Sequence, residues 1–396
     1  MTNKYELLSP VGDFKMLYSA IAAGADAVYL GLKEFNMRDA AKNFKVADLT
    51  KIKKICQSSP RNPKIYLTLN TIIYDNEINK IEKIFKKVKG KIDAIICWDL
   101  SVIKLCKKYR IPFHLSTQAS VANSSSAEFY KKLGAERIVL ARELNLKQIK
   151  KISKIVDIEC FIHGAMCVSV SGRCFTSQFI HRLSANRGQC AHPCRRAWKI
   201  IDDANHELKL ENDRVMSAKD LCTLPFIEKM KKAKILNFKI EGRNRSPEYV
   251  YAVTSAYRKA LDKKLSHKEI LELLNELKKV YNRGFSSGFY IRIPTNDDFS
   301  FSENGEQTEH KEFIGNVQKY WPKVKAAKIK LVQGKIKIGD EVYIVSNKAS
   351  IQRVKIESIE IDRKKMPSAK KDDEIAILLP KCFKGDEIYF IKKKLP

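Results

Sequence analysis

The sequence lacks the features that mark several large classes of protein. Its 396 residues contain no run close to the roughly 18–20 unbroken apolar residues that a membrane helix requires. The first residues, MTNKYELLSPVGD, contain neither the apolar stretch nor the small-residue cleavage site of a signal peptide, and a strand pattern begins almost at once. We therefore expect a cytoplasmic protein with no membrane span.

Acidic residues are in deficit as well. The chain has 75 Lys and Arg against 45 Asp and Glu, which gives a formal net charge of +30. Such an excess favours a polyanionic partner, because neutralising phosphates releases condensed counterions. The alternative is a solvated lysine-rich surface, since much of the surplus lies on helical stretches such as IKKISK and FIEKMKKAK. The charge therefore favours contact with nucleic acid but does not by itself establish it.

Short β-rich runs alternate with amphipathic helical stretches over the first 245 residues or so. Helical patterns such as FKMLYSAIAAG and EINKIEKIFKKV separate most of the strands. Eight strands with intervening helices predict a closed (β/α)8 barrel of the TIM type. An open doubly wound sheet is the alternative, but no glycine-rich phosphate turn follows the first strand. The predicted strands are Glu6–Ser9, Ala27–Gly31, Ile65–Asn70, Ala94–Trp98, Phe113–Thr117, Arg137–Ala141, Glu159–His163 and Leu236–Glu241.

The chain divides into a barrel, a linker and a second domain. The barrel domain is expected over residues 1–290, with an insertion at 164–235 between the seventh and eighth strands. A loop that follows a barrel strand opens onto the carboxyl face, where active sites are built. After a polar linker at 291–312, the pattern is all-β. Short alternating strands with two Gly-Asp turns predict a small β-barrel over residues 313–396.

Polar residues follow most of the predicted strands and should converge on the carboxyl face. We expect Arg142 and Arg243, with Gln118 and Lys239, to bind a substrate that carries carboxylate or phosphate groups, which guanidinium binds bidentately. His163 and Glu241 are the candidates for proton transfer. The alternative for each residue is strand-end capping or ion pairing, such as Glu241 with Arg243. The further members of the set are Ser9, Pro10, Arg38, Asn43, Asn70, Asp99, Thr117 and Glu143.

Five of the ten cysteines lie in one 56-residue stretch of the insertion. In a reducing cytoplasm, such a group indicates metal or redox chemistry rather than disulfides. Four thiolates suit a structural zinc or an iron–sulfur cluster. Zinc ribbons prefer closely paired cysteines, and only one pair here approaches that spacing. Free buried thiols are the third alternative. The five are Cys167, Cys174, Cys190, Cys194 and Cys222, with Arg173, Arg187, Arg195 and Arg196 nearby to offset thiolate charge.

Several segments together resemble the peptidase U32 family over nearly the whole chain. The strongest are IECFIHGAMCVSVSGRC and ANRGQCAHPCRR, supported by ELLSPVGDFKMLYSAIAAGADAVYLGL, STQASVAN, LARELNLKQIKKI, SAKDLC and FKIEGRNRSPEYV. The resemblance implies oxygen-independent hydroxylation that depends on a [4Fe–4S] cluster. It also implies Cys167, Cys174 and Cys190 as cluster ligands. Cys222 is implied as the fourth ligand, with Cys194 as its competitor.

Members of this family act on transfer RNA, on ribosomal RNA or on a quinone precursor, and the RNA-directed members are thought to take the hydroxyl oxygen from prephenate. The positive charge and the C-terminal β-module favour RNA over the quinone, and the module is expected to contact RNA. The overall length favours 5-hydroxyuridine formation in transfer RNA over cytidine hydroxylation in 23S ribosomal RNA. The family name keeps a collagenase-like peptidase as the alternative. However, the chain has no HExxH, GxSxG or Ser/Lys motif, and only His163 and Cys167 suggest a Cys–His pair.

Overall fold

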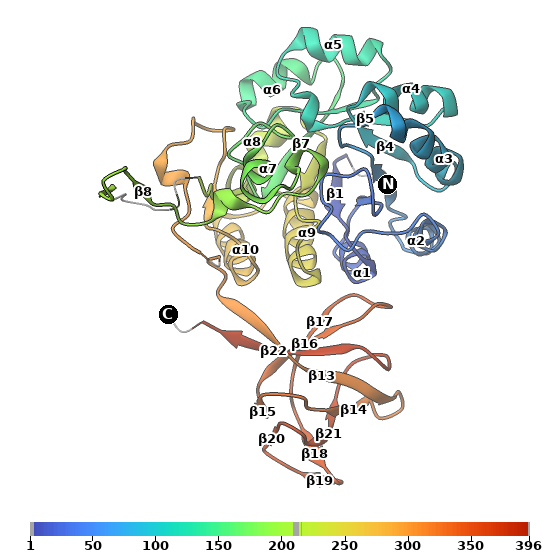
Figure 1. The fold of residues 1–396 in the computed structure, drawn as a ribbon. Coiled ribbons are helices and arrows are strands. Elements are labelled where there is room, and N and C mark those ends of the chain that lie inside the picture. The colour runs from blue at the N-terminus through green and yellow to red at the C-terminus, as the bar shows by residue number, and fades with distance from the viewer. Residues whose placement is uncertain (1–3, 209–213, 215, 304, 395–396) are drawn as a thin grey trace.

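Eight parallel strands close into a barrel in the computed structural model, which describes residues 4–208, 214, 216–303 and 305–394 (Figure 1). Each strand pairs with the next one along the chain, and β11 closes the ring by pairing with both β1 and β7. The predicted (β/α)8 fold is confirmed, and each predicted strand overlaps an observed one. The barrel strands are β1 (Glu6–Pro10), β2 (Ala27–Gly31), β3 (Lys64–Thr68), β4 (Ala94–Cys97), β5 (Phe113–Leu115), β6 (Arg137–Val139), β7 (Asp157–Gly164) and β11 (Asn237–Ile240).

Helices cover the outside of the barrel, and short polar side chains fix where several of them begin. Asp13, Asp99, Asn123 and Asn145 each accept a hydrogen bond from a backbone N–H group in the first turn of the helix that follows. These N-caps satisfy donors that a helix end leaves free. The helices are α1 (Phe14–Ala22), α2 (Asp48–Gln57), α3 (Ile78–Val88), α4 (Leu100–Tyr109), α5 (Ser124–Lys132), α6 (Leu146–Ile152), α8 (Ile227–Lys232), α9 (Pro247–Asp262) and α10 (His267–Lys279). None of the described helices is long and apolar enough to cross a membrane.

The inside of the barrel contains a layer of ion pairs, here called the barrel floor: Glu6, Arg137, Glu159 and Lys239. The Glu159 side chain is fully buried and contacts Lys239 Nζ at 2.6 Å and Arg137 Nη1 at 3.3 Å. Arg137 also contacts Glu6 at 2.6 Å. Each of these charges has an opposite charge beside it, so the floor is electrostatically complete.

The insertion between β7 and α8 lies over the carboxyl face of the barrel. It contains a short helix, α7 (Thr176–His181), and the strands β8 (Ile200–Ile201), β9 (Glu207–Leu208) and β10 (Asp220–Cys222). β10 pairs antiparallel with the end of β7, and β12 (Phe285–Ser286) pairs with β10. Residues 209–213 and 215, in the polar part of the insertion, lie outside the described residues.

The C-terminal region is a curled antiparallel sheet with a hydrophobic core separate from that of the barrel, as the predicted fold class requires. Figure 1 shows it beneath α1, α9 and α10. Ion pairs from Lys15 to Glu387 (2.7 Å) and from Lys311 to Glu248 (2.9 Å) join it to the starts of α1 and α9. The strands are β13 (Glu309–Trp321), β14 (Ala326–Lys330), β15 (Lys335–Lys337), β16 (Glu341–Val345), β17 (Gln352–Lys355), β18 (Ile359–Ile361), β19 (Lys364–Lys365), β20 (Ser368–Lys370), β21 (Glu374–Leu378) and β22 (Glu387–Lys393).

Candidate active site

A cavity of about 200 Å³ opens at the carboxyl face, between the strand ends and the insertion. The strand ends supply a polar wall and the insertion supplies a wall of thiols. Because parallel strands direct their carboxyl ends to one face, residues far apart in sequence meet here. The side chains that matter below are Tyr29, Arg38, Gln118, Arg142, Lys239, Glu241 and Arg243 on the polar wall, and Cys167, Cys174, Cys190 and Cys194 on the thiol wall.

Glu241 lies directly after β11 and forms an ion pair with Arg38, which follows β2. The carboxylate accepts from Arg38 Nε at 3.1 Å and lies 3.0 Å from Nη2. Burial alone would raise the pKa of Glu241, but Arg38, Arg142 and Arg243 outweigh it and hold the pKa below its usual value. Glu241 is therefore ionised at neutral pH, so it can accept a proton or orient a cation there.

Arg142 and Arg243 both line the cavity, and neither forms an ion pair with a carboxylate among the described residues. Arg142 Nη1 donates to the Ala165 carbonyl at 3.0 Å, and its guanidinium lies 4.0 Å from the centre of the Phe161 ring. Its buried Nε has no hydrogen-bond partner in the part of the chain that the structure describes. Arg243 donates to Thr68 Oγ1 (3.0 Å) and to Asn36 Oδ1 (2.9 Å), and burial lowers its pKa to about 10. Arg243 is buried and Arg142 is half-buried. Because neither guanidinium has a carboxylate in direct contact among the described residues, the two favour an anionic ligand.

Gln118 and Lys239 also line the cavity, as predicted for substrate-binding residues, but both are already engaged. Gln118 Oε1 accepts a hydrogen bond from the Ser116 hydroxyl. Lys239 belongs to the barrel floor through Glu159, and its ammonium group lies 4.6 Å from the centre of the Tyr29 ring. Lys239 therefore closes the bottom of the cavity and contributes positive charge that Glu159 already compensates.

Four thiols of the insertion lie around the same cavity. Cys167 is exposed, whereas Cys174, Cys190 and Cys194 are half-buried. Burial raises the pKa of Cys194, and the other three thiols raise it further, which indicates that all four lie near one another. Burial also acts to raise the pKa of Cys174, but hydrogen bonds from Thr176 and Ser169 outweigh it and lower that pKa.

The fifth thiol of the insertion lies elsewhere. Cys222 is buried on β10, opposite His163 of β7, and its sulfur lies 3.7 Å from the Tyr257 hydroxyl of α9. Burial raises its pKa to about 11. Cys222 thus packs between the barrel and α9, outside the set of residues that line the cavity.

His163, predicted to transfer protons, also lies behind the barrel wall. Its ring packs against Tyr249 and Tyr257 of α9 and against Phe285, with centroid distances of 5.5–5.9 Å. Burial lowers its pKa to about 3, so the imidazole is neutral. Strand alternation would place His163 on the same face as Phe161, which lines the cavity. The pairing of β7 with β11 shifts register at this point, and such an irregularity reverses the face.

Arg38 and Tyr29 are the cavity residues with the clearest contacts to which the sequence assigned no role. Arg38 was noted among the strand-end residues, but nothing in the sequence pairs it with Glu241, 203 residues away. Tyr29 lies within β2, and its hydroxyl donates to the Ile240 carbonyl at 2.8 Å. Its inward position on a predicted barrel strand is the signal that could have identified it.

The fold and the site define a (β/α)8-barrel protein whose carboxyl face carries a thiol-lined, arginine-rich cavity. Residues 12–299 match peptidase family U32, and the chain belongs to this family, as its motifs predicted. A Methanocaldococcus jannaschii protein named as an uncharacterized protease is 39% identical over 98% of this chain and 99% of its own. A Porphyromonas gingivalis protein named collagenase is 36% identical over 99% of both chains. The tRNA hydroxylation protein P1 of Bacillus subtilis is 35% identical over 81% of this chain and 78% of its own.

Proposed function

We propose that this protein is an oxygen-independent RNA hydroxylase that binds a [4Fe–4S] cluster at the thiol wall of the cavity. The observation that carries the proposal is that four thiols and several cationic strand-end residues line one cavity. A relative named for tRNA hydroxylation, 35% identical to this chain, supports the reaction class. When bound, a cluster of this kind supplies one-electron redox chemistry.

The donor set fits such a cluster. Among the described residues, no three His, Cys, Asp or Glu side chains converge closely enough to hold a single metal ion. A [4Fe–4S] cluster is bound by four thiolates, and four thiols line one wall of this cavity. Cys167, Cys174 and Cys190 would hold three corners. We assign the fourth to Cys194 rather than to Cys222, because Cys194 lines the cavity and Cys222 packs against α9.

The polar wall would bind the small co-substrate, a dicarboxylate such as prephenate. Arg142 offers an unpartnered buried Nε, and Arg243 has only neutral acceptors among the described residues. A carboxylate placed between these guanidinium groups would compensate both charges. Glu241 would keep Arg38 oriented and, being ionised, could accept a proton from the substrate.

A peptidase remains the second candidate, because two relatives carry protease or collagenase names. A Cys–His mechanism needs an imidazole within hydrogen-bond reach of its thiol. His163 packs behind β7 against α9, whereas Cys167 lines the cavity on the other side of the barrel wall. His163 is buried among aromatic rings, and this burial keeps its imidazole neutral. This arrangement favours the hydroxylase over a peptidase built on that pair.

Transfer RNA, hydroxylated at uridine, is the proposed substrate. A second cavity lies between the C-terminal sheet and the barrel. Its lining includes Lys15, Lys42, Arg245 and Lys311, each of which has a carboxylate partner. Arg243 borders both cavities, so this interface lies beside the mouth. The C-terminal sheet is thus suitably located to contact RNA held at the active site.

The decisive experiment compares transfer RNA from cells with and without the gene by mass spectrometry. We expect a uridine derivative with one additional oxygen atom to disappear in the deletion strain and to return with the wild-type gene but not with Cys167→Ala. Anaerobically purified protein should contain about four irons per chain. Unchanged RNA, together with proteolysis that survives removal of the cysteines, would support the peptidase instead.

A further inference from the structure

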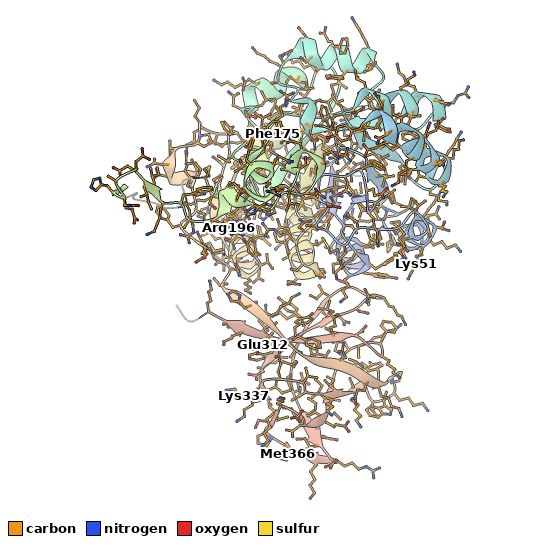
Figure 2. The ribbon with its side chains drawn as sticks, in the orientation of Figure 1. Lys51, Phe175, Arg196, Glu312, Lys337 and Met366 are labelled. Atoms are coloured by element: carbon orange, nitrogen blue, oxygen red, sulfur yellow. The ribbon has the colours of Figure 1, made fainter. Side chains whose placement is uncertain are left out.

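A segment of the insertion exposes an unusual number of apolar side chains at the edge of the cavity. Phe179 is 84% exposed and Phe175 is 62% exposed. Phe175, labelled in Figure 2, lies at the N-terminal end of α7. Isolated exposed apolar residues need no explanation, but a contiguous group usually marks a binding surface. The group, here called the rim patch, consists of Val168, Val170, Phe175, Phe179, Ile180 and Leu183.

The rim patch is continuous with the cavity. Val168 and Val170 line the cavity themselves, and Phe175 stands between Cys174 and Thr176, which also line it. Two hydrogen bonds hold this segment in place. The Cys174 backbone N–H donates to Asn186 Oδ1 at 2.8 Å, and the Ala191 N–H donates to Ser177 Oγ at 3.1 Å. A ligand on the rim patch would therefore lie directly beside the mouth of the cavity.

The stretch of chain that contains the rim patch is rich in positive charge. No acidic residue occurs between Glu159 and Asp202, whereas this stretch contains six Arg and Lys residues. Arg173 and Arg182 flank the two phenylalanines in the sequence and are themselves exposed. Within the described part of the chain, neither forms an ion pair. Aromatic faces next to unpaired guanidinium groups are typical of surfaces that bind single-stranded nucleic acid.

We infer that the rim patch is a stacking platform that binds unpaired nucleobases beside the mouth of the cavity. The inference rests on the proposed function and names the surface that would hold the substrate. The rings of Phe175 and Phe179 have centroids 6.4 Å apart and planes inclined by 54°. Rings so inclined do not sandwich one base, and each offers a face to a separate base. Bases paired in a duplex have no free face for such contacts, whereas a base in a loop can also turn into the cavity.

The test measures RNA binding by the full-length protein, without turnover. Fluorescence anisotropy would compare a fluorescein-labelled oligouridine with a labelled RNA duplex of equal length. Phe175→Ala and Phe179→Ala should each weaken oligouridine binding about tenfold, the range expected for loss of one base–aromatic stack. Phe179→Trp should retain the affinity, whereas Phe179→Leu, which stays apolar but has no ring face, should lose it. Phe129→Ala removes a ring of 64% exposure from α5 and serves as the matched control.

The outcomes separate this inference from the proposed function. Unchanged binding in the alanine variants, or full affinity in Phe179→Leu, would refute the stacking platform even if the wild type hydroxylates RNA. Conversely, if the variants show the expected binding pattern but the wild type does not hydroxylate RNA, the stacking platform is supported and the proposed function is refuted. Sedimentation velocity adds a third arm. A wild-type dimer that dissociates in Phe179→Ala would identify the rim patch as a protein interface and overturn the inference.

Discussion

Buried arginines occur at two levels of the barrel, and they differ in what surrounds them. In the barrel floor, burial would lower the pKa of Arg137, but Glu159 and Glu6 outweigh that effect and raise it. At the mouth, burial lowers the pKa of Arg243 to about 10, and its hydrogen bonds go to neutral oxygens. The charged form of arginine is therefore stabilised in the floor, at Arg137, and destabilised at the mouth, at Arg243.

This difference separates structure from function within one barrel. The floor is complete without a ligand, because each of its charges has an opposite charge beside it. At the mouth, Arg243 is a buried cation whose desolvation is not fully offset, and a bound anion would offset it. The comparison predicts that changes in the floor reduce stability, whereas changes at the mouth reduce ligand binding or activity. The predictions below test that division.

The largest effect is expected at the thiol wall. Cys167→Ala, Cys174→Ala and Cys190→Ala should each abolish RNA hydroxylation, by about 10³-fold or more, because each would remove a cluster ligand. Iron content and the visible absorption spectrum of anaerobically purified protein measure the loss directly. The free energy of unfolding of the protein without its cluster should change little, because these thiols line a cavity and do not pack in the core.

The fourth ligand provides the control for that prediction. Cys194→Ala should lose the iron, whereas Cys222→Ala should keep it and lose only the packing of a buried thiol against Tyr257. The opposite result would restore Cys222 as the ligand. It would also mean that β10 moves toward the cavity when the cluster binds.

The next effect is expected in the floor. Glu159→Gln should lower the free energy of unfolding by about 3 kcal/mol, because it leaves Lys239 buried without its counter-charge. Urea unfolding followed by circular dichroism measures this change. Glu241→Gln, the same substitution at the mouth, should cost clearly less, because the Arg38–Glu241 pair is partly exposed. Equal losses in the two variants would contradict the division between floor and mouth.

Most of the fold could be predicted from sequence, since parallel barrel strands are short apolar runs bounded by polar turns. The strand at Ala27–Gly31 was predicted with its observed bounds. The errors were at strand ends. The strand that begins at Phe113, for example, ends at Leu115 and not at Thr117 as predicted. There a short 3-10 turn at Thr117–Ala119 replaces strand pairing, and sequence patterns do not distinguish the two.

The site was less predictable, because it depends on which way individual side chains face. The strand-end rule correctly indicated that Arg142, Arg243 and Glu241 share one cavity. The shift in the β7–β11 pairing that turns His163 toward α9 leaves no mark in the hydrophobic pattern. In the same way, cysteine spacing does not reveal that Cys222 lies on a strand paired to β7, whereas Cys194 lies in a short 3-10 turn at the cavity.

A smaller effect than the loss of Glu159 is expected at Arg142. Arg142→Ala should weaken binding of a dicarboxylate co-substrate about 30-fold, as expected for loss of a charge-assisted hydrogen bond worth about 2 kcal/mol. Iron content should stay unchanged. Isothermal titration with prephenate measures the affinity, and Arg142→Lys, which keeps the charge but not the guanidinium geometry, should recover only part of it. Wild-type affinity in Arg142→Ala would show that the anion binds elsewhere.

The smallest effect concerns the pH dependence of the Arg38–Glu241 pair. The folded-state pKa of Glu241 lies below its usual value of 4.5, so the pair stabilises the fold above that pH. Its contribution should be lost as the pH falls from 4.5 through the lower folded pKa, because the carboxylate then binds a proton in the folded state also. At neutral pH, Glu241→Gln should reduce the free energy of unfolding by about 1 kcal/mol.

The measurement is urea unfolding of the wild type and of Glu241→Gln at a series of pH values from neutral to acid. The difference between the two should be constant above pH 4.5 and should shrink below it, since a protonated Glu241 resembles the glutamine that replaces it. A difference that persists unchanged in acid would mean that the carboxylate stabilises the mouth by its shape and hydrogen bonds alone. In that case the charge of Glu241 would not compensate that of Arg38. Arg38 would then be a further cation, besides Arg142 and Arg243, that could bind the substrate.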